Sequence, residues 1–236
     1  PKSILPLSPH ARRVEEKALG YLKLACDQLG SPTPPLPVPV EEWIELVFGF
    51  EFGIEDFRTL YGVDALGGCW HPRVKDRTVG RIAIDVRVVE PGLRRFTCAH
   101  ELGHMFLHSR VRKEFIDQFI LEEQGGDPHE RQANQFAAGF LMPVPILVPE
   151  LLDILDQTSL GRVHGMHCVH SVSEQSEVLW RMHVLPRLLE RFGVSLSAMT
   201  RRLTELCLTD RQALMPVEIA ERIRVNPPAR PSCIRS

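Results

Sequence analysis

The sequence predicts an α+β protein in which a small three-stranded sheet packs on helices, with a helical extension at the C-terminal end. Three observations lead to this class. Apolar and polar residues alternate over 81–89, as in a strand with one buried face. Apolar residues recur at helical spacing over 127–141. Further helical patterns then fill the region after Pro149.

The composition is that of a globular protein. The chain has 236 residues, 44% of them hydrophobic and 25% charged, which is enough for one substantial core. A net charge of −2 argues against a general surface for polyanions. Six scattered cysteines without a CxxC pair indicate reduced thiols, and residues 1–18 carry charges where a signal peptide needs an apolar segment. We therefore expect a cytoplasmic protein.

The first ninety residues are expected to hold two helices and all three strands. Apolar residues share one side of 9–29, and Gly30 ends that helix because glycine readily takes a left-handed conformation. The next ten residues contain five prolines, so this connector is neither helical nor central in a sheet. The expected elements are helices at 9–29 and 41–47 and strands at 48–54, 64–70 and 81–89.

The rest of the chain is expected to be helical. Pro91-Gly92 ends the last strand, and Asp127 with Pro128 marks a later helix start, because Asp caps helices and proline fits their first turn. The expected helices are one through 96–108, then 111–123, 127–141, 149–157, 177–192 and 196–206. We expect one domain at 1–145, a helical C-terminal region at 146–225 and a tail at 226–236.

The motif that carries chemistry is His100-Glu101-x-x-His104. Residues four apart lie on one face of a helix, so both imidazoles can bind the same metal ion. Glu101 projects about 100° round the helix from His100, where it can act as the base on a water molecule. The competing interpretation is a structural helix with two unrelated histidines. A third ligand elsewhere in the chain would favour the catalytic interpretation.

Glu130 is the candidate for that third ligand. Two histidines and one glutamate give a catalytic zinc three protein ligands and leave one position open. The spacing equally fits a capping box, in which Glu130 bonds back to the helix start at Asp127. Spacing alone leaves both interpretations open, and His129 is a weaker alternative ligand.

These residues resemble the ImmA/IrrE-type metallopeptidases. The resemblance is carried by Arg95-Phe96-Thr97 through His104, by Glu130-x-x-Ala133-Asn134-x-x-Ala137-Ala138 and by Leu141-Met142-Pro143. It implies a zincin-like fold, zinc bound by His100, His104 and Glu130, and Glu101 as the base. Members of that family are intracellular bacterial and phage proteases that cleave helix-turn-helix repressors in mobile-element and stress-response switches.

Several other histidines are considered for the site. His108 extends the motif by one turn, and we expect it to support the ligands rather than to bind metal. His71, His183 or an arginine could stabilise the oxyanion, a role for which Tyr21 and Tyr61 are weaker candidates. His164-x-x-His167-Cys168-x-His170 matches no named metal pattern, and we interpret it as a loop rather than a structural zinc site.

The sequence therefore predicts a zinc endopeptidase, with manganese as an alternative metal, acting on an intracellular DNA-binding repressor. The alternative is a DNA-binding or metal-sensing regulator without proteolytic activity. It rests on residues 191–203, which look like a helix-turn-helix with Gly193 in the turn and Arg201 and Arg202 on the second helix. Such helix pairs also close domains of the ImmA/IrrE type, so we expect packing or substrate docking there rather than direct DNA binding.

Overall fold

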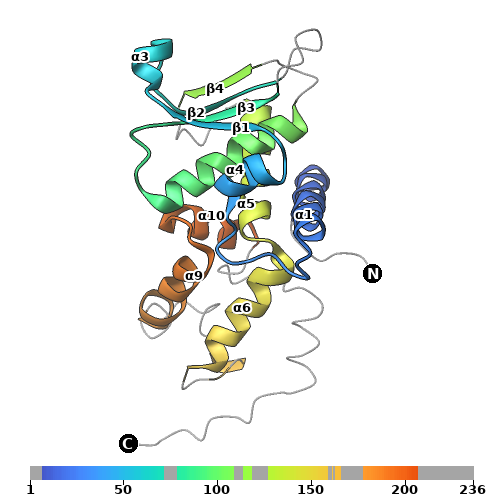
Figure 1. Cartoon of the computed structure of the whole chain (residues 1–236). Coiled ribbons are helices and arrows are strands. Elements are labelled where there is room, and N and C mark those ends of the chain that lie inside the picture. The colour runs from blue at the N-terminus through green and yellow to red at the C-terminus, as the bar shows by residue number, and fades with distance from the viewer. Residues whose placement is uncertain are drawn as a thin grey trace, which may run out of the picture. The chain divides into compact units, whose positions relative to one another are not determined.

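The computed structural model describes residues 7–71, 79–108, 114–118, 127–158, 161, 163–165 and 178–206. The chain forms two compact units. One consists of Ser8–Val144 with Leu189–Met199, and the other contains the described residues of Pro145–Leu188 and those from Thr200 onward. The first unit holds the sheet and the helix with the histidine motif, and the predicted α+β class is confirmed (Figure 1). The domain boundaries at 145 and 225 stay a prediction.

The sheet of the first unit has the strand order β1-β3-β2-β4. Strand β1 is parallel to β3, whereas β2 is antiparallel to both β3 and β4. The three predicted strands are present, and β4 adds a fourth at the edge. The strands are β1 (Glu51–Glu55), β2 (Ala65–Trp70), β3 (Arg81–Asp85) and β4 (Glu114–Gln118).

The prediction of a helix over 111–123 is wrong, because Glu114–Gln118 is a strand. This segment pairs with β2 from Trp70 opposite Glu114 to Ala65 opposite Gln118. The pairing gives the backbone groups of β2 hydrogen-bond partners that a helix at 111–123 would not supply. Such a non-local pairing overrides the local helical pattern.

The helix that carries the histidine motif, α4 (Pro91–Leu107), runs beneath the sheet and packs on β2 and β3 (Figure 1). Helix α5 (Pro128–Leu141) packs on the other side of α4, and α1 (Pro9–Leu29) packs on α5. Helix α2 (Val40–Leu46) also contacts α4. The motif helix is therefore enclosed between the sheet and other helices, as its apolar surface required.

The opposite face of the sheet is covered at one end by α3 (Phe57–Tyr61). Phe57 packs there on Ala65 and Ala83, all three being fully buried. Strand β3 consequently has buried residues on both faces, which the simple alternation over 81–89 did not predict. The strand also ends at Asp85 rather than at Val89. The Asp85 carboxylate accepts hydrogen bonds from the backbone N–H groups of Phe57 and Arg87, each at 2.9 Å, and this turns the chain.

The predicted ends of α1 and α5 are confirmed, whereas α4 begins five residues before the range predicted for it. Helix α1 is capped at its start by Ser8, whose hydroxyl accepts from the Ala11 N–H at 3.2 Å, and at its end by Gly30 with φ of 66°. Helix α4 begins at Pro91, and the Glu90 carboxylate accepts from two backbone N–H groups of its first turn. Helix α5 begins at Pro128 with Asp127 as its cap.

The C-terminal helices are α6 (Val144–Asp156), a π-helical turn η1 (Trp180–Val184), α9 (Leu185–Phe192) and α10 (Leu196–Glu205). Helix α6 begins five residues earlier than predicted. Ser195 caps α10 by accepting from the Ala198 N–H at 3.3 Å. The predictions for His167, Cys168, His170 and the tail at 226–236 lie outside the described residues.

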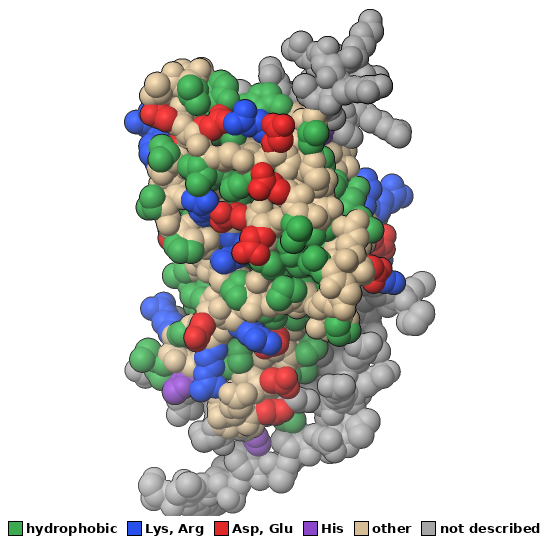
Figure 2. Space-filling view, in the orientation of Figure 1, with side chains coloured by type: hydrophobic (Ala, Val, Ile, Leu, Met, Phe, Trp, Pro, Cys, Tyr) green, Lys and Arg blue, Asp and Glu red, His purple; other side chains and the backbone are tan. Residues whose placement is uncertain are grey.

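The surface drawn in Figure 2 mixes acidic, basic and apolar side chains, in keeping with the small net charge. Among the described residues, Cys26, Cys69 and Cys98 are buried. No single helix of the described chain has the length and apolar character needed to cross a membrane. Only α5 and α6, taken together as a bent pair, reach that length and composition.

Candidate active site

The motif residues of α4 are buried in the first unit. His100 is 8% exposed, and both Glu101 and His104 are fully buried. The two histidines present the same ring nitrogen to a common point, since their Nε2 atoms lie 3.1 Å apart. The helical spacing of four thus brings together the two atoms that the sequence predicted to meet.

Glu130 brings a carboxylate to the same point from the first turn of α5. Its Oε2 lies 3.2 Å from His100 Nε2, and its Oε1 lies 3.5 Å from His104 Nε2. Among the described residues, these three side chains form a group whose donor atoms all lie within 4.8 Å of one another. The helix start itself is capped by Asp127, which accepts from the His129 N–H at 2.9 Å.

The spacing of the three donors fits a zinc ion. Ligand atoms at about 2.0–2.1 Å from a tetrahedral zinc lie about 3.3 Å from one another. The two Nε2 atoms lie 3.1 Å apart, Glu130 Oε2 lies 3.2 Å from His100 Nε2, and Glu130 Oε1 lies 3.5 Å from His104 Nε2. Three protein donors of this kind leave one position for water or substrate, which is typical of catalytic zinc sites.

A close contact between α4 and α5 makes this geometry possible. A Cβ atom on Gly103 would lie 3.2 Å from the Ala133 Cα and 3.2 Å from the Phe136 Cβ. Gly103 therefore lets the two helices approach each other one residue from His104. The contact thus assigns this glycine a role in packing.

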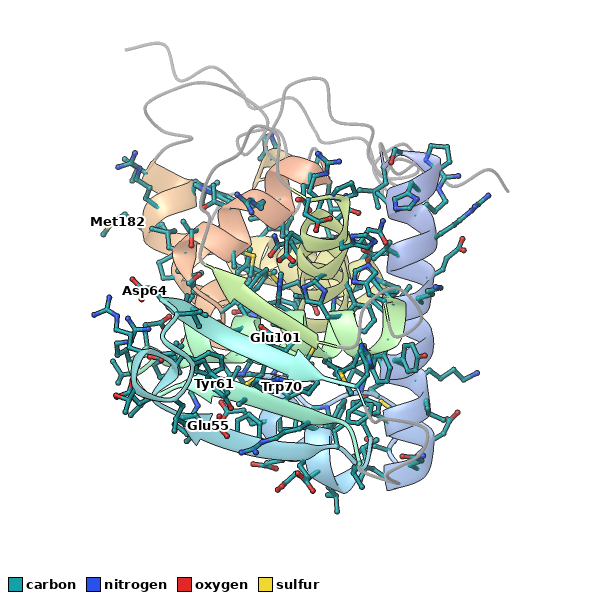
Figure 3. All side chains as sticks on the ribbon, turned by 90° about the horizontal axis from the view of Figure 1, so that it is seen from above. Glu55, Tyr61, Asp64, Trp70, Glu101 and Met182 are labelled. Atoms are coloured by element: carbon teal, nitrogen blue, oxygen red, sulfur yellow. The ribbon has the colours of Figure 1, made fainter. Side chains whose placement is uncertain are left out.

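Glu101 lies on the sheet side of α4. A Cβ atom on Gly67 of β2 would lie only 2.7 Å from Glu101 Oε1 and 2.9 Å from the Thr97 side chain. Figure 3 looks onto the sheet from the side opposite α4, and Glu101 lies behind the strands. Gly67 thus gives the carboxylate its space. The sequence did not indicate this role.

The histidines are supported from behind by hydrogen bonds. His100 Nδ1 lies 3.0 Å from Asn134 Oδ1, and His104 Nδ1 lies 3.0 Å from His108 Nδ1. His108 Nε2 in turn lies 3.1 Å from Gln132 Oε1. His108 is 2% exposed, and burial lowers its pKa to about 4. It therefore takes the supporting place that was expected of it, rather than joining the ligand group.

Two of these supporting residues were not predicted. Asn134 follows Glu130 by four residues, so helical spacing places it on the same face of α5 and could have indicated it. Gln132 carried no such signal, because its contact goes through His108.

The other histidines considered for the site lie outside the group of three donors. His129 Nδ1 lies 2.7 Å from Asp127 Oδ1, and its ring meets the edge of His108 rather than the ligand group. His71 follows β2 directly, and its pKa is lowered by burial and by the charge of nearby His104. His183 is exposed on η1 in the other unit.

Both tyrosines are engaged in other contacts. The Tyr21 ring stacks on Phe106 with centroids 3.6 Å apart. The Tyr61 hydroxyl donates to the Glu55 carboxylate at 2.6 Å. These contacts agree with the expectation that tyrosine is a weak candidate for the oxyanion role.

The family model described as the IrrE N-terminal-like domain, named Peptidase M78, matches residues 69–204, more than half of the chain. The chain belongs to this family. The predicted resemblance is thereby confirmed, and the family is one of metal-dependent peptidases. The matched residues contain the histidine motif, Glu130 and both supporting amides.

Two individual proteins are similar to parts of this IrrE-like chain. The "Uncharacterized immunity region protein 2" of Bacillus phage phi105 is 42% identical over 50 residues, which cover 21% of this chain and 30% of the phage protein. A solved Mycobacterium tuberculosis transcriptional regulator is 17% identical, with a TM-score of 0.44, over 84% of this chain and 47% of that protein. The matches thus cover less than half the length of the phage protein and less than half the length of the regulator.

The helix pair at the C-terminal end was the basis of the DNA-binding alternative. Its turn belongs to the first unit, where Arg95 donates to the Gly193 carbonyl. A Cβ atom on Gly92 would meet the Ser195 backbone nitrogen at 2.6 Å. Arg202, one of the two arginines on which the DNA-binding alternative rested, is 2% exposed. These contacts favour packing as the role of this turn.

Proposed function

We propose that this chain is a zinc-dependent endopeptidase in which His100, His104 and Glu130 hold the metal and Glu101 is the catalytic base. One observation carries the proposal: three side chains from two helices bring donor atoms within 3.1–3.5 Å of one another, beside a fully buried glutamate. Membership in a peptidase family supports the same reaction class. Manganese remains an alternative metal, since histidine and carboxylate ligands suit both ions.

The metal ion and the protein side chains have separate roles in peptide hydrolysis. When bound, zinc supplies a Lewis acid that acidifies water and polarises a carbonyl group. Glu101 accepts the proton of the attacking water and delivers it to the amine that leaves. Because Glu101 is held between α4 and Gly67, its carboxylate needs little reorganisation when the proton moves. His71 is a candidate donor for the oxyanion, because it directly follows β2, the strand that packs on α4.

The proposed substrate is a DNA-binding repressor in the cytoplasm, cleaved in a switch that controls mobile-element or stress-response genes. Two observations support it. The resemblance to ImmA/IrrE-type proteases implies such substrates, and the phage relative is named for an immunity region. Direct contact of this chain with nucleic acid is not part of the proposal.

Glu101→Gln tests the reaction. Amide and carboxylate have nearly the same size, so we expect this variant to retain about one zinc per chain and to lose at least about 1,000-fold in cleavage rate. Comparison of protein N-termini in cells with the wild-type chain and with the variant identifies the cleaved protein. That protein is then digested with purified enzyme.

A variant that still cleaves the same bond would refute Glu101 as the base. A wild-type chain that binds zinc and DNA, with affinity falling steeply as salt rises, and that cleaves nothing would favour the regulator instead.

A further inference from the structure

Two hydrogen-bond paths begin at the histidines of the proposed metal site, and each path ends at an amide side chain on α5. Asn134 Oδ1 contacts His100 Nδ1 directly at 3.0 Å. Gln132 Oε1 reaches His104 through His108, by contacts of 3.1 and 3.0 Å. Both amides lie on the helix that also carries Glu130. One helix therefore controls the environment of all three donors.

The longer path has a direction, because an amide oxygen only accepts hydrogen bonds. A neutral imidazole has one N–H donor and one acceptor nitrogen. Gln132 Oε1 accepts, so His108 Nε2 carries the proton and its Nδ1 is the acceptor. The atom facing that acceptor is His104 Nδ1, which must therefore donate. His104 Nε2 is then left with its lone pair directed at Glu130 and His100.

The shorter path leads to the same state for the other histidine. Asn134 Oδ1 accepts from His100 Nδ1, so the proton of His100 also lies on Nδ1 and its Nε2 keeps a lone pair. The two Nε2 atoms lie 3.1 Å apart and face the same carboxylate. Both histidines thus present the unprotonated nitrogen that a metal ion requires.

We propose that Gln132, acting through His108, and Asn134 are positioning residues that fix the tautomers of His104 and His100 for metal binding. This inference rests on the proposed metal site and adds to it the residues that prepare its ligands. The Gln132 hydrogen bond goes to His108, and it reaches His104 through that residue. Outer hydrogen bonds of this kind commonly contribute about 10- to 100-fold to metal affinity.

The tautomers are measured directly by nitrogen-15 NMR of the full-length chain labelled on histidine, before and after zinc is removed with a chelator. We expect His108 to carry its proton on Nε2 in both samples. After chelation we expect His100 and His104 to carry theirs on Nδ1. A proton on Nδ1 of His108, or on Nε2 of His104 in the zinc-free sample, would overturn the proposal without any variant being made.

Variants at Gln132 then test whether the hydrogen-bond path from Gln132 through His108 to His104, called the relay below, matters for zinc binding. Gln132→Leu removes the acceptor, and we expect about 10-fold weaker zinc binding, measured by competition with a chromophoric chelator, together with a mixed His108 tautomer. Gln132→Glu restores an acceptor oxygen and should return both the tautomer and the affinity. Gln135→Leu makes the same replacement one turn along α5 and controls for a general effect on the helix.

If Gln132→Leu keeps wild-type zinc affinity and a single His108 tautomer, the relay has no role. These results are separable from the proposed protease activity. A chain with the expected tautomers and zinc affinity that cleaves no protein would contradict the protease and leave the relay intact. A chain that cleaves its substrate but has the opposite tautomers would contradict the relay and leave the proposed protease activity intact.

Discussion

The two sides of helix α4 hold their functional groups by different means. On the sheet side, the Glu101 carboxylate faces Gly67 of β2, where any side chain would lie too close to it. On the α5 side, His100 and His104 are fixed by hydrogen bonds to other side chains and face Glu130. One turn of one helix thus presents a base to a strand and two ligands to a neighbouring helix.

This difference separates two functions that a peptidase site needs. Metal binding depends on α5, which supplies Glu130 and the amide partners of the histidines. Proton transfer depends on β2, which leaves room for the base and little else. We therefore expect changes on the α5 side to alter metal affinity first. Changes on the sheet side should lower the rate of cleavage while the metal stays bound.

The largest effect on zinc binding is expected from Glu130→Gln, which tests the α5 side. Loss of the charged donor that faces both histidines should weaken zinc binding by about 100-fold or more, because even outer partners of metal ligands contribute up to that amount. Zinc affinity is measured by chelator competition. The control is Glu16→Gln, at an exposed position of α1. Unchanged affinity in Glu130→Gln would show that this carboxylate is not a ligand.

The sheet side is tested by Gly67→Ala. The new methyl group would lie 2.7 Å from Glu101 Oε1, so the carboxylate must move. Displacement of a catalytic group by about 1 Å lowers rates by about 100-fold. We expect a loss of that order in kcat for the protein substrate, with zinc affinity within about twofold of wild type. Loss of zinc in this variant would show that the two sides of α4 are not independent.

The sequence predicted the α4 side of the site better than its surroundings, and the reason is physical. His100, Glu101 and His104 belong to one helix, and helical spacing fixes their relative directions without reference to the rest of the fold. Glu130 lies on another helix. Its distance from the histidines depends on how α4 and α5 pack, so spacing alone left a capping role equally open.

The strands show the same limit. The alternation over 81–89 indicated β3, because alternating apolar residues are a local signal of a strand, although both faces of β3 are buried. Strand β4 is defined by its pairing with β2, a contact between distant parts of the chain, and its sequence was assigned to a helix. The sequence did not indicate Gly67 for a related reason, since its role depends on the α4 side chain that faces it.

The smallest effect is expected from Gly103→Ala, which tests the close packing behind the α5 side. A Cβ atom there would lie 3.2 Å from the Ala133 Cα, so the helices must separate by a few tenths of an ångström. We expect the free energy of unfolding to fall by about 1–3 kcal/mol, measured by urea denaturation, with a smaller loss of zinc affinity. Gly20→Ala is the matched control, because Gly20 lies within α1 and its Cβ would meet nothing within 4 Å. There the higher helix propensity of alanine should raise the unfolding free energy by up to about 1 kcal/mol. If both substitutions stabilise the protein, the approach of α5 to α4 does not depend on a glycine at position 103.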